Sequence, residues 1–136
     1  MTAQPIHQRQ PINSGQLRKD VVGRRGEQRA QEYLVTLGYR ILQVNWRSPT
    51  GELDIVALDG RQLVICEVKT RTSDRYGTPR EAVTEAKERR IRRLAMQWVK
   101  TARPPGVRWS SVRYDVIGVI APRYGDMRVT HLMAAF

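Results

Sequence analysis

The chain of 136 residues has little cysteine, few acidic residues and no long apolar run. Its single cysteine, Cys66, leaves no partner for an internal disulfide, and no apolar stretch approaches the roughly 18 residues of a membrane-spanning helix. The first twenty residues also lack the apolar segment of a secretory signal. We therefore expect a cytoplasmic protein with no membrane partner. Because 40% of the residues are hydrophobic, the chain can still bury a core.

Acidic residues are outnumbered, with 13 Asp and Glu against 24 Lys and Arg. The formal net charge is +11 and the sequence pI is near 10.8. Such an excess favours a polyanionic partner, because Lys and Arg displace condensed counterions from phosphates. The alternative is that the basic balance serves only solubility.

Periodicity and turn residues divide the chain into a leader and one domain. Residues 1–20 are polar and without periodicity, so we expect a flexible leader, followed by a single nuclease-like α/β domain over 21–136. Apolar spacing predicts a helix ending near residue 37 at Gly38, and a second helix ending before residue 104. Strands are predicted over 39–47, 52–58, 63–70, 111–120 and 127–132. The order α-β-β-β-α-β-β predicts a mixed β-sheet flanked by helices.

Two capping signals precede the second helix. Thr78-Pro79-Arg80-Glu81 fits a capping box with proline at the first helical position, and Thr84 is an equally good start. The sequence leaves both starts open.

Charged residues interrupt strands that otherwise have the pattern of a buried sheet. Glu67 and Lys69 lie two residues apart in the apolar segment 63–69, where buried charge is costly unless it is paired or binds a metal. If Asp59-Gly60 forms a two-residue hairpin loop, Glu52 faces Glu67 and Asp54 is its diagonal neighbour on the same side. The sequence thus predicts a patch of three carboxylates beside a lysine, and this prediction depends on the turn.

Such a patch suits a hard divalent cation. Carboxylates of Asp54 and Glu67 with the Val68 carbonyl are a reasonable ligand set for Mg²⁺ or Mn²⁺, with Glu52 as a supporting acid. Lys69 could orient a water or stabilise charge that develops on a phosphate, which is the apparatus of phosphodiester hydrolysis. The alternative is a structural Glu67–Lys69 ion pair at a strand end.

At these residues the chain resembles two related groups of proteins. Gly51-Glu52-Leu53-Asp54 followed by Glu67-Val68-Lys69 is similar to the Asp…Glu-x-Lys pattern of the PD-(D/E)xK nuclease superfamily. Over about residues 23–120 the chain resembles the YraN-like family of bacterial proteins. The motifs that carry this second resemblance are Arg25-Gly26-Glu27, Tyr33-Leu34, Gly38-Tyr39, Asn45-Trp46-Arg47, Gly51-Glu52-Leu53-Asp54, Glu67-Val68-Lys69-Thr70-Arg71 and Gly77-Thr78-Pro79 with Glu81-Ala82-Val83.

The resemblance implies a restriction-endonuclease-like core with kinship to archaeal Holliday junction resolvases. It implies Asp54 and Glu67 as metal ligands, Lys69 as the catalytic lysine and Glu27 as a further acid. Leu53 stands where the superfamily usually has proline. From the residues themselves, Glu27 continues the apolar stripe of the first helix and should point toward the sheet; the alternative is a first-turn acid facing the helix dipole.

Basic residues gather after the third strand and along the second helix. Glu88 is the only acid among residues 87–113, and such sustained positive charge favours a polyanion over simple solvation, which is the alternative. The candidate nucleic-acid-binding residues are Arg71, Arg75, Lys87, Arg89, Arg90, Arg92 and Arg93.

Other polar residues have structural explanations. Asp115 is better explained as a partner for Arg113 than as a ligand, and Cys66 as a core residue. His7 and His131 are too far apart in the sequence to suggest a metal-binding cluster.

Together these features predict a Mg²⁺-dependent endonuclease acting on DNA, with branched or single-stranded DNA as candidate substrates. A homodimer would suit two-fold symmetric junctions. The alternatives are a nucleic-acid-binding protein that keeps the fold without cutting, and a subunit whose basic surface docks on an acidic protein.

Overall fold

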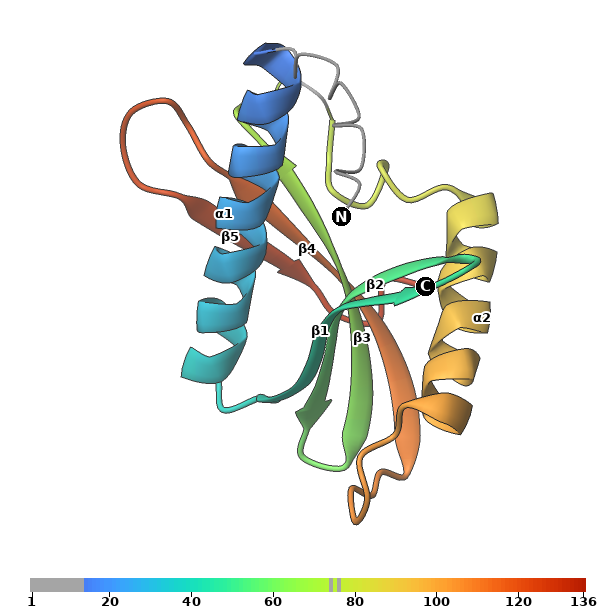
Figure 1. Cartoon of the computed structure of the whole chain (residues 1–136). Coiled ribbons are helices and arrows are strands. Elements are labelled where there is room, and N and C mark those ends of the chain that lie inside the picture. The colour runs from blue at the N-terminus through green and yellow to red at the C-terminus, as the bar shows by residue number, and fades with distance from the viewer. Residues whose placement is uncertain (1–13, 74, 76) are drawn as a thin grey trace, which may run out of the picture.

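The computed structural model describes residues 14–73, 75 and 77–136. Its elements follow the predicted order α-β-β-β-α-β-β. They are α1 (Ser14–Thr36), β1 (Arg40–Ser48), β2 (Gly51–Asp59), β3 (Gln62–Arg71), α2 (Glu85–Thr101), β4 (Ser111–Ile120) and β5 (Arg128–Leu132) (Figure 1).

The five strands of the described residues form one sheet in the order β1-β2-β3-β4-β5. β1, β2 and β3 make an antiparallel meander, and β4 and β5 are also antiparallel. β3 and β4 run parallel because the connection that contains α2 carries the chain back to the end of the sheet where β3 begins. The sheet is therefore mixed, as predicted for this α/β domain.

α1 is longer than the sequence pattern suggests. It begins at Ser14, before the predicted domain start at residue 21, so the end of the predicted leader is helical. Residues 1–13 of that leader lie outside the described residues. The helix stops at the predicted glycine: Gly38 has a φ of +90°, the left-handed conformation typical of a helix C-terminus.

The β2–β3 hairpin has a different register from the predicted one. Its loop residues are Gly60 and Arg61, so Asp59 pairs with Gln62. Gly60 has a φ of +57° while Arg61 does not have a positive φ, as in hairpin turns with glycine at the first loop position. The prediction of Asp59-Gly60 as the loop was wrong by one residue. The pairing moves by two residues, which leaves every side chain on its predicted face.

Both capping signals before α2 are used, for different purposes. The helix itself starts after Thr84, whose hydroxyl accepts the Lys87 N–H (3.2 Å). Thr78 and Glu81 form a reciprocal capping pair: the Thr78 hydroxyl accepts the Glu81 N–H (3.3 Å), and the Glu81 carboxylate accepts the Thr78 N–H (3.4 Å). This pair closes a turn that precedes the helix.

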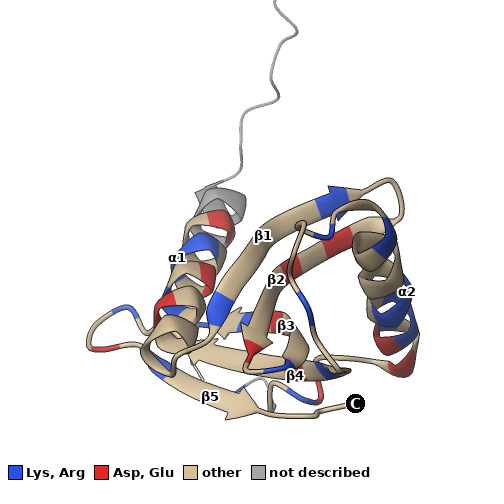
Figure 2. Cartoon of the chain, turned by 90° about the horizontal axis from the view of Figure 1, so that it is seen from below, with Lys and Arg blue, Asp and Glu red and all other residues tan. Residues whose placement is uncertain are grey.

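The helices cover opposite faces of the sheet, as Figure 2 shows. Alternate β3 side chains enter two separate cores: Leu63 and Ile65 pack in the core beneath α2, and Val64 and Cys66 pack in the core beneath α1. Burial raises the pKa of the Cys66 thiol, in agreement with its predicted role as a core residue.

This arrangement of a mixed five-stranded sheet between two helices is consistent with a restriction-endonuclease-like core. Within the described ranges, neither helix combines the length and the apolar character needed to cross a membrane.

Candidate functional site

The candidate site lies where β2 and β3 separate. Their ladder ends at Ile55 and Cys66, and the next residues in the same register are Asp54 and Glu67. The Asp54 Oδ2 atom accepts the Val68 N–H at 2.8 Å, so a side chain replaces the main-chain partner that a longer ladder would provide. Asp54 therefore lies opposite Glu67 in the register, where the sequence predicted a diagonal neighbour.

Glu52 takes a different position from the predicted one. The sequence predicted it opposite Glu67, but the register differs by two residues, so Asp54 and not Glu52 is in line with Glu67. In the structure Glu52 pairs with Arg47 of β1, and its Oε2 atom lies 3.5 Å from the Arg47 Nε atom. The three-carboxylate patch predicted at Glu67 is therefore a patch of two β-strand carboxylates.

Two lysines hold the Glu67 carboxylate. Glu67 is buried, with 7% of its surface exposed. Its Oε1 atom lies 3.2 Å from the Lys69 Nζ atom and 2.9 Å from the Lys87 Nζ atom. Lys87, a predicted nucleic-acid-binding residue, reaches from α2 into the site.

The carboxylates and ammonium groups perturb one another's protonation. Burial and the nearby Glu67 charge raise the pKa of Asp54 to about 8, although the Val68 N–H opposes the shift. Burial also lowers the pKa of Lys69, helped by the neighbouring Lys87 ammonium. For Lys87, burial alone would lower the pKa, but hydrogen bonding to Lys69 and Glu67 outweighs it and raises the pKa.

Glu27 approaches the same patch from α1. Burial raises its pKa, and the Glu52 and Glu67 charges add to the rise. With its nitrogen turned toward the acids, the Asn45 amide donates to Glu27 Oε2 (3.0 Å) and Glu52 Oε1 (3.1 Å). Because α1 begins at Ser14, Glu27 is far from the first turn, and the helix-dipole alternative does not apply.

Sequence analysis missed Asn45 as a site residue. It lies within β1 with a φ of +49°, a conformation that asparagine tolerates better than most residues. The only signal was its place in the Asn45-Trp46-Arg47 motif of the resemblance, because a positive φ within a strand has no clear sequence pattern.

Gly26 allows α1 to come close enough for Glu27 to reach the site. A Cβ atom at position 26 would lie 1.9 Å from the Thr70 Oγ1 atom of β3. Any larger residue would therefore push the helix away from the sheet. Gly26, next to Glu27, is therefore needed for the close packing of α1 on β3.

The donor atoms at the strand separation fit a divalent cation. The N–H and C=O of one strand residue point to the same edge, so the Val68 carbonyl faces the edge where its N–H meets Asp54. Two carboxylates and one carbonyl are hard oxygen ligands suited to Mg²⁺ or Mn²⁺. Across the described residues, no three His, Cys, Asp or Glu side chains are gathered in a metal-binding arrangement. Glu27 is held by Asn45 instead.

Most of the other predicted nucleic-acid residues lie on the surface. Arg89, Arg90 and Arg93 are exposed on α2, which carries the basic bands visible in Figure 2. Arg92 stacks on two aromatic rings, 4.5 Å from the centroid of Tyr114 and 5.6 Å from that of Phe136. Arg71, the last residue of β3, and Arg75, in the loop that follows, are both exposed.

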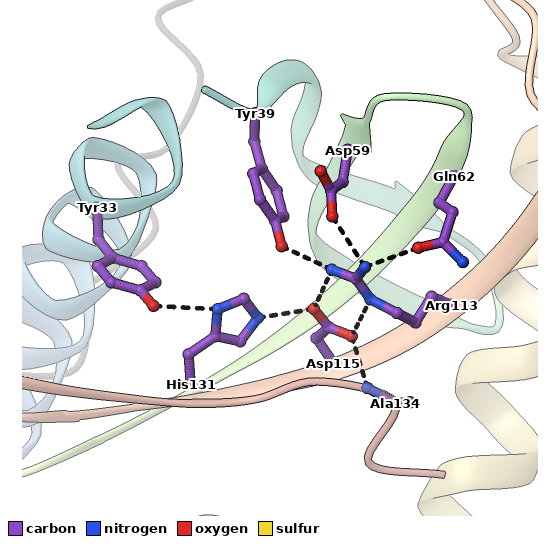
Figure 3. A network of polar contacts seen from close by, with 8 residues as sticks. All are labelled: Tyr33, Tyr39, Asp59, Gln62, Arg113, Asp115, His131 and Ala134. Atoms are coloured by element: carbon purple, nitrogen blue, oxygen red, sulfur yellow. Dashed lines mark hydrogen bonds and ion pairs between the residues drawn. The ribbon is translucent and has the colours of Figure 1, made fainter. Parts of the chain in front are cut away.

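A second polar cluster lies elsewhere in the sheet, centred on Asp115 (Figure 3). Arg113 donates to both Asp115 oxygens at 2.9 Å, which confirms the predicted pairing. The His131 Nε2 atom lies 2.7 Å from Asp115 Oδ2, and the Ala134 N–H donates to Oδ1 at 3.0 Å. Sequence analysis missed His131 because its link to Asp115 arises only from the β4–β5 pairing.

The remaining Arg113 donors are also satisfied. They bind Asp59 (2.9 Å), Gln62 (2.8 Å) and the Tyr39 hydroxyl (2.7 Å). Among the residues that the structure describes, no buried side-chain nitrogen or oxygen lacks a hydrogen-bond partner. We call this group of residues the Asp115 network.

Comparison with known proteins finds a family match over most of the chain. The model of the Uncharacterised protein family UPF0102 matches residues 26–119, which include Glu27, Asp54, Glu67, Lys69 and Lys87. A UPF0102 protein of Frankia alni is 50% identical over 118 residues, 87% of this chain and 96% of the relative. UPF0102 proteins of an Arthrobacter species and a Nocardioides species are 51% and 47% identical over 114 residues, 84% of this chain and 94% and 90% of the respective relatives.

Proposed function

The chain belongs to the UPF0102 family, the YraN-like family of bacterial proteins. From the geometry of its candidate site, we propose that it is a metal-dependent endonuclease of the PD-(D/E)xK type. It would hydrolyse phosphodiesters of DNA in a reducing cytoplasm. The observation that supports the proposal most is the meeting of Asp54 and Glu67 where β2 and β3 separate, with Lys69 3.2 Å from the Glu67 carboxylate.

In this proposal Asp54, Glu67 and the Val68 carbonyl hold Mg²⁺ or Mn²⁺. When bound, the cation activates water for attack and neutralises charge on the phosphate. The protein would fix the ligands beforehand, since the Val68 N–H already orients the Asp54 carboxylate. Glu67 is buried and Asp54 is half-buried, and this partial exclusion of water would strengthen their interaction with a cation.

The two lysines supply positive charge beside the carboxylates. Both Nζ atoms contact the same Glu67 oxygen, Oε1. Lys69 and Lys87 would be the ammonium groups that hydrogen-bond the nonbridging oxygens of a phosphate held beside Glu67. Lys69 is the better placed to stabilise the charge that develops there, because it extends from the strand that carries Glu67.

The distribution of charge also supports a nucleic-acid substrate. Arg89, Arg90 and Arg93 on α2 are exposed groups that could bind phosphates. A homodimer would place two such sites on a two-fold symmetric junction.

The test is calorimetric titration of Mn²⁺ into the wild type, Asp54→Asn and the control Asp126→Asn. Asp126 is an exposed loop aspartate, so its substitution removes one acid without touching the site. Each protein is then incubated with labelled duplex, single-stranded and four-way-junction DNA. We expect the wild type and Asp126→Asn to bind Mn²⁺ and cut at least one substrate, and Asp54→Asn to lose both properties.

A second candidate function is DNA binding without cleavage. It is favoured by the two ammonium groups on Glu67, which already neutralise that carboxylate without a metal. If the wild type binds DNA in a salt-sensitive manner but neither binds Mn²⁺ nor cuts, the nuclease proposal is wrong and this second function is supported.

A further inference from the structure

A cavity of about 520 Å³ opens beside Lys69, on the side away from Asp54's strand. It lies between the 77–82 turn and strands β4 and β5. Its charged lining residues are Lys69, Arg71 and Arg128. Its volume falls within the roughly 300–1,000 Å³ typical of pockets for small organic ligands. We call it the Lys69 pocket.

The lining has two chemical parts. Three cationic side chains face a floor and wall of apolar groups that include Pro79, Ala82, Val119, Ile120 and Leu132. No carboxylate is among the described residues that line it. A ligand that matches both parts has an anionic group and a flat, largely apolar body. A nucleotide has this combination, with a phosphate for the cations and a base for the apolar wall.

The wall of the pocket is held in place by close packing. A Cβ atom at Gly118 of β4 would lie 2.2 Å from the Pro79 Cγ atom, so the turn rests directly on the strand. The reciprocal hydrogen bonds of Thr78 and Glu81 close the same turn. The pocket is therefore formed before any ligand arrives, which lowers the entropic cost of binding.

We propose that the Lys69 pocket receives one unpaired nucleotide of the DNA strand next to the phosphate that is cut. The inference rests on the proposed function, because Lys69 belongs both to this pocket and to the carboxylate site. A base within a duplex is stacked and paired, so it must leave the helix before it can enter such a pocket. The protein should therefore prefer DNA with an unpaired nucleotide over a continuous duplex.

The preference can be measured without cleavage. Fluorescence anisotropy in EDTA gives the affinity for a duplex with a one-nucleotide bulge and for the fully paired duplex of the same sequence. A 2-aminopurine at the bulge reports its environment through its emission. Thr130→Trp fills the pocket from an exposed position of β5, so it should not disturb the core. Arg128→Ala removes one lining cation, and Arg123→Ala removes an exposed arginine that does not line the pocket.

We expect the wild type and Arg123→Ala to bind the bulged duplex about tenfold more tightly than the paired one, since the bulged base is already unpaired. Thr130→Trp should abolish this ratio, and Arg128→Ala should weaken binding of the bulged duplex about threefold to tenfold through one lost phosphate contact. The 2-aminopurine emission should change on binding to the wild type and stay unchanged with Thr130→Trp.

Three results would overturn the inference. One is an equal affinity of the wild type for both duplexes, and another is an unchanged ratio in Thr130→Trp. The third is competition by a free 5′-mononucleotide without any preference for the bulge, which would assign the pocket to small ligands. Because no metal is present, these results leave the nuclease proposal to be judged by Mn²⁺ binding and cleavage. If the protein prefers the bulged duplex but does not cut DNA, the inference about the pocket stands and the nuclease proposal fails.

Discussion

Asp115 and Asp54 are aspartates on neighbouring parts of one sheet, but their surroundings are arranged in opposite ways. Asp115 is fully buried and accepts hydrogen bonds from Arg113, His131 and Ala134. Burial alone would raise its pKa, yet these donors hold the pKa of Asp115 below its ordinary value. Asp54 has one main-chain donor and faces another carboxylate, and its pKa is raised to about 8.

The difference separates a cluster whose charges are satisfied within the fold from one that keeps two carboxyl groups side by side. In the Asp115 network each charge has its partners, so the group fixes the packing of β4, β5 and the hairpin and has no need of a ligand. At Asp54 and Glu67 the two acids repel each other. Folded proteins retain such an unfavourable contact where it serves binding or catalysis. Three substitutions and one comparison across pH test this contrast.

The largest expected effect is on the Asp115 network. Asp115→Asn leaves the buried Arg113 guanidinium without its main counter-charge, so we expect the free energy of unfolding to fall by about 3–5 kcal/mol. Urea denaturation at neutral pH measures the change. The control Asp126→Asn, in an exposed loop, should change stability by less than about 0.5 kcal/mol. A similar loss in both variants would show that the network is not a special source of stability.

Asp54→Asn should have the opposite sign. An amide keeps an acceptor for the Val68 N–H and removes the cost of keeping Asp54 protonated in the folded state, so the metal-free protein should gain about 1–3 kcal/mol at neutral pH. The same denaturation experiment measures the gain. A loss of stability comparable to that of Asp115→Asn would contradict the distinction between the two clusters.

The two clusters should also respond to pH in opposite directions. The folded-state pKa of Asp54 is about 8 and its ordinary value is 3.8, so the folded protein retains a proton that the unfolded chain releases. Its contribution makes stability decline as pH rises from about 4 to about 8, by up to about 1.4 kcal/mol per pH unit. Asp115 has a lowered pKa, so its contribution is present above pH 3.8 and is lost as pH falls through the folded-state pKa.

The contribution of Asp54 to the pH dependence of stability can be measured from denaturation midpoints. These are compared between the wild type and Asp54→Asn across this pH range. Subtracting the variant's profile from that of the wild type should leave a decline between about pH 4 and pH 8. A difference that stays constant over this interval would refute the assignment of the raised pKa to Asp54.

The smallest effect is expected at the edge of the Asp115 network. The Tyr33 hydroxyl lies 3.1 Å from the His131 Nδ1 atom, and Tyr33→Phe removes this one hydrogen bond. We expect a loss of about 1 kcal/mol in thermal or urea unfolding. Tyr124→Phe is the matched control, because Tyr124 is 84% exposed. Equal stability of the two variants would show that the network ends at His131.

The sequence was sufficient to predict the elements of the fold. Apolar periodicity placed both helices, and alternation with turn residues placed all five strands of the described chain. The hairpin register was wrong because Asp59-Gly60 and Gly60-Arg61 are both acceptable two-residue loops, and only the glycine conformation distinguishes them. The same-face prediction for Asp54 and Glu67 survived because the pairing moved by two residues.

The site was predictable only where one strand pair determines it. Asp54 lies on β2, and Glu67 and Lys69 lie on β3, so alternation along the strands and one short hairpin relate their side chains. Lys87 and Glu27 depend on where the helices dock, and Asn45 depends on a positive φ within a strand. Local pattern predicted that Glu27 points toward the sheet, but the contacts of all three residues arise from packing between distant elements.

The strand order has a consequence for how the molecule folds. β1, β2 and β3 are joined by short turns, whereas β4 must find β3 across the whole of α2. Local pairings close small loops and form early, and the parallel pairing closes a large one. Pulsed hydrogen exchange should therefore protect β2 and β3 amides before those of β4. Asp54 and Glu67 would then be brought together while the chain is still largely unfolded, and the Asp115 network, which needs β4 and β5, would form last.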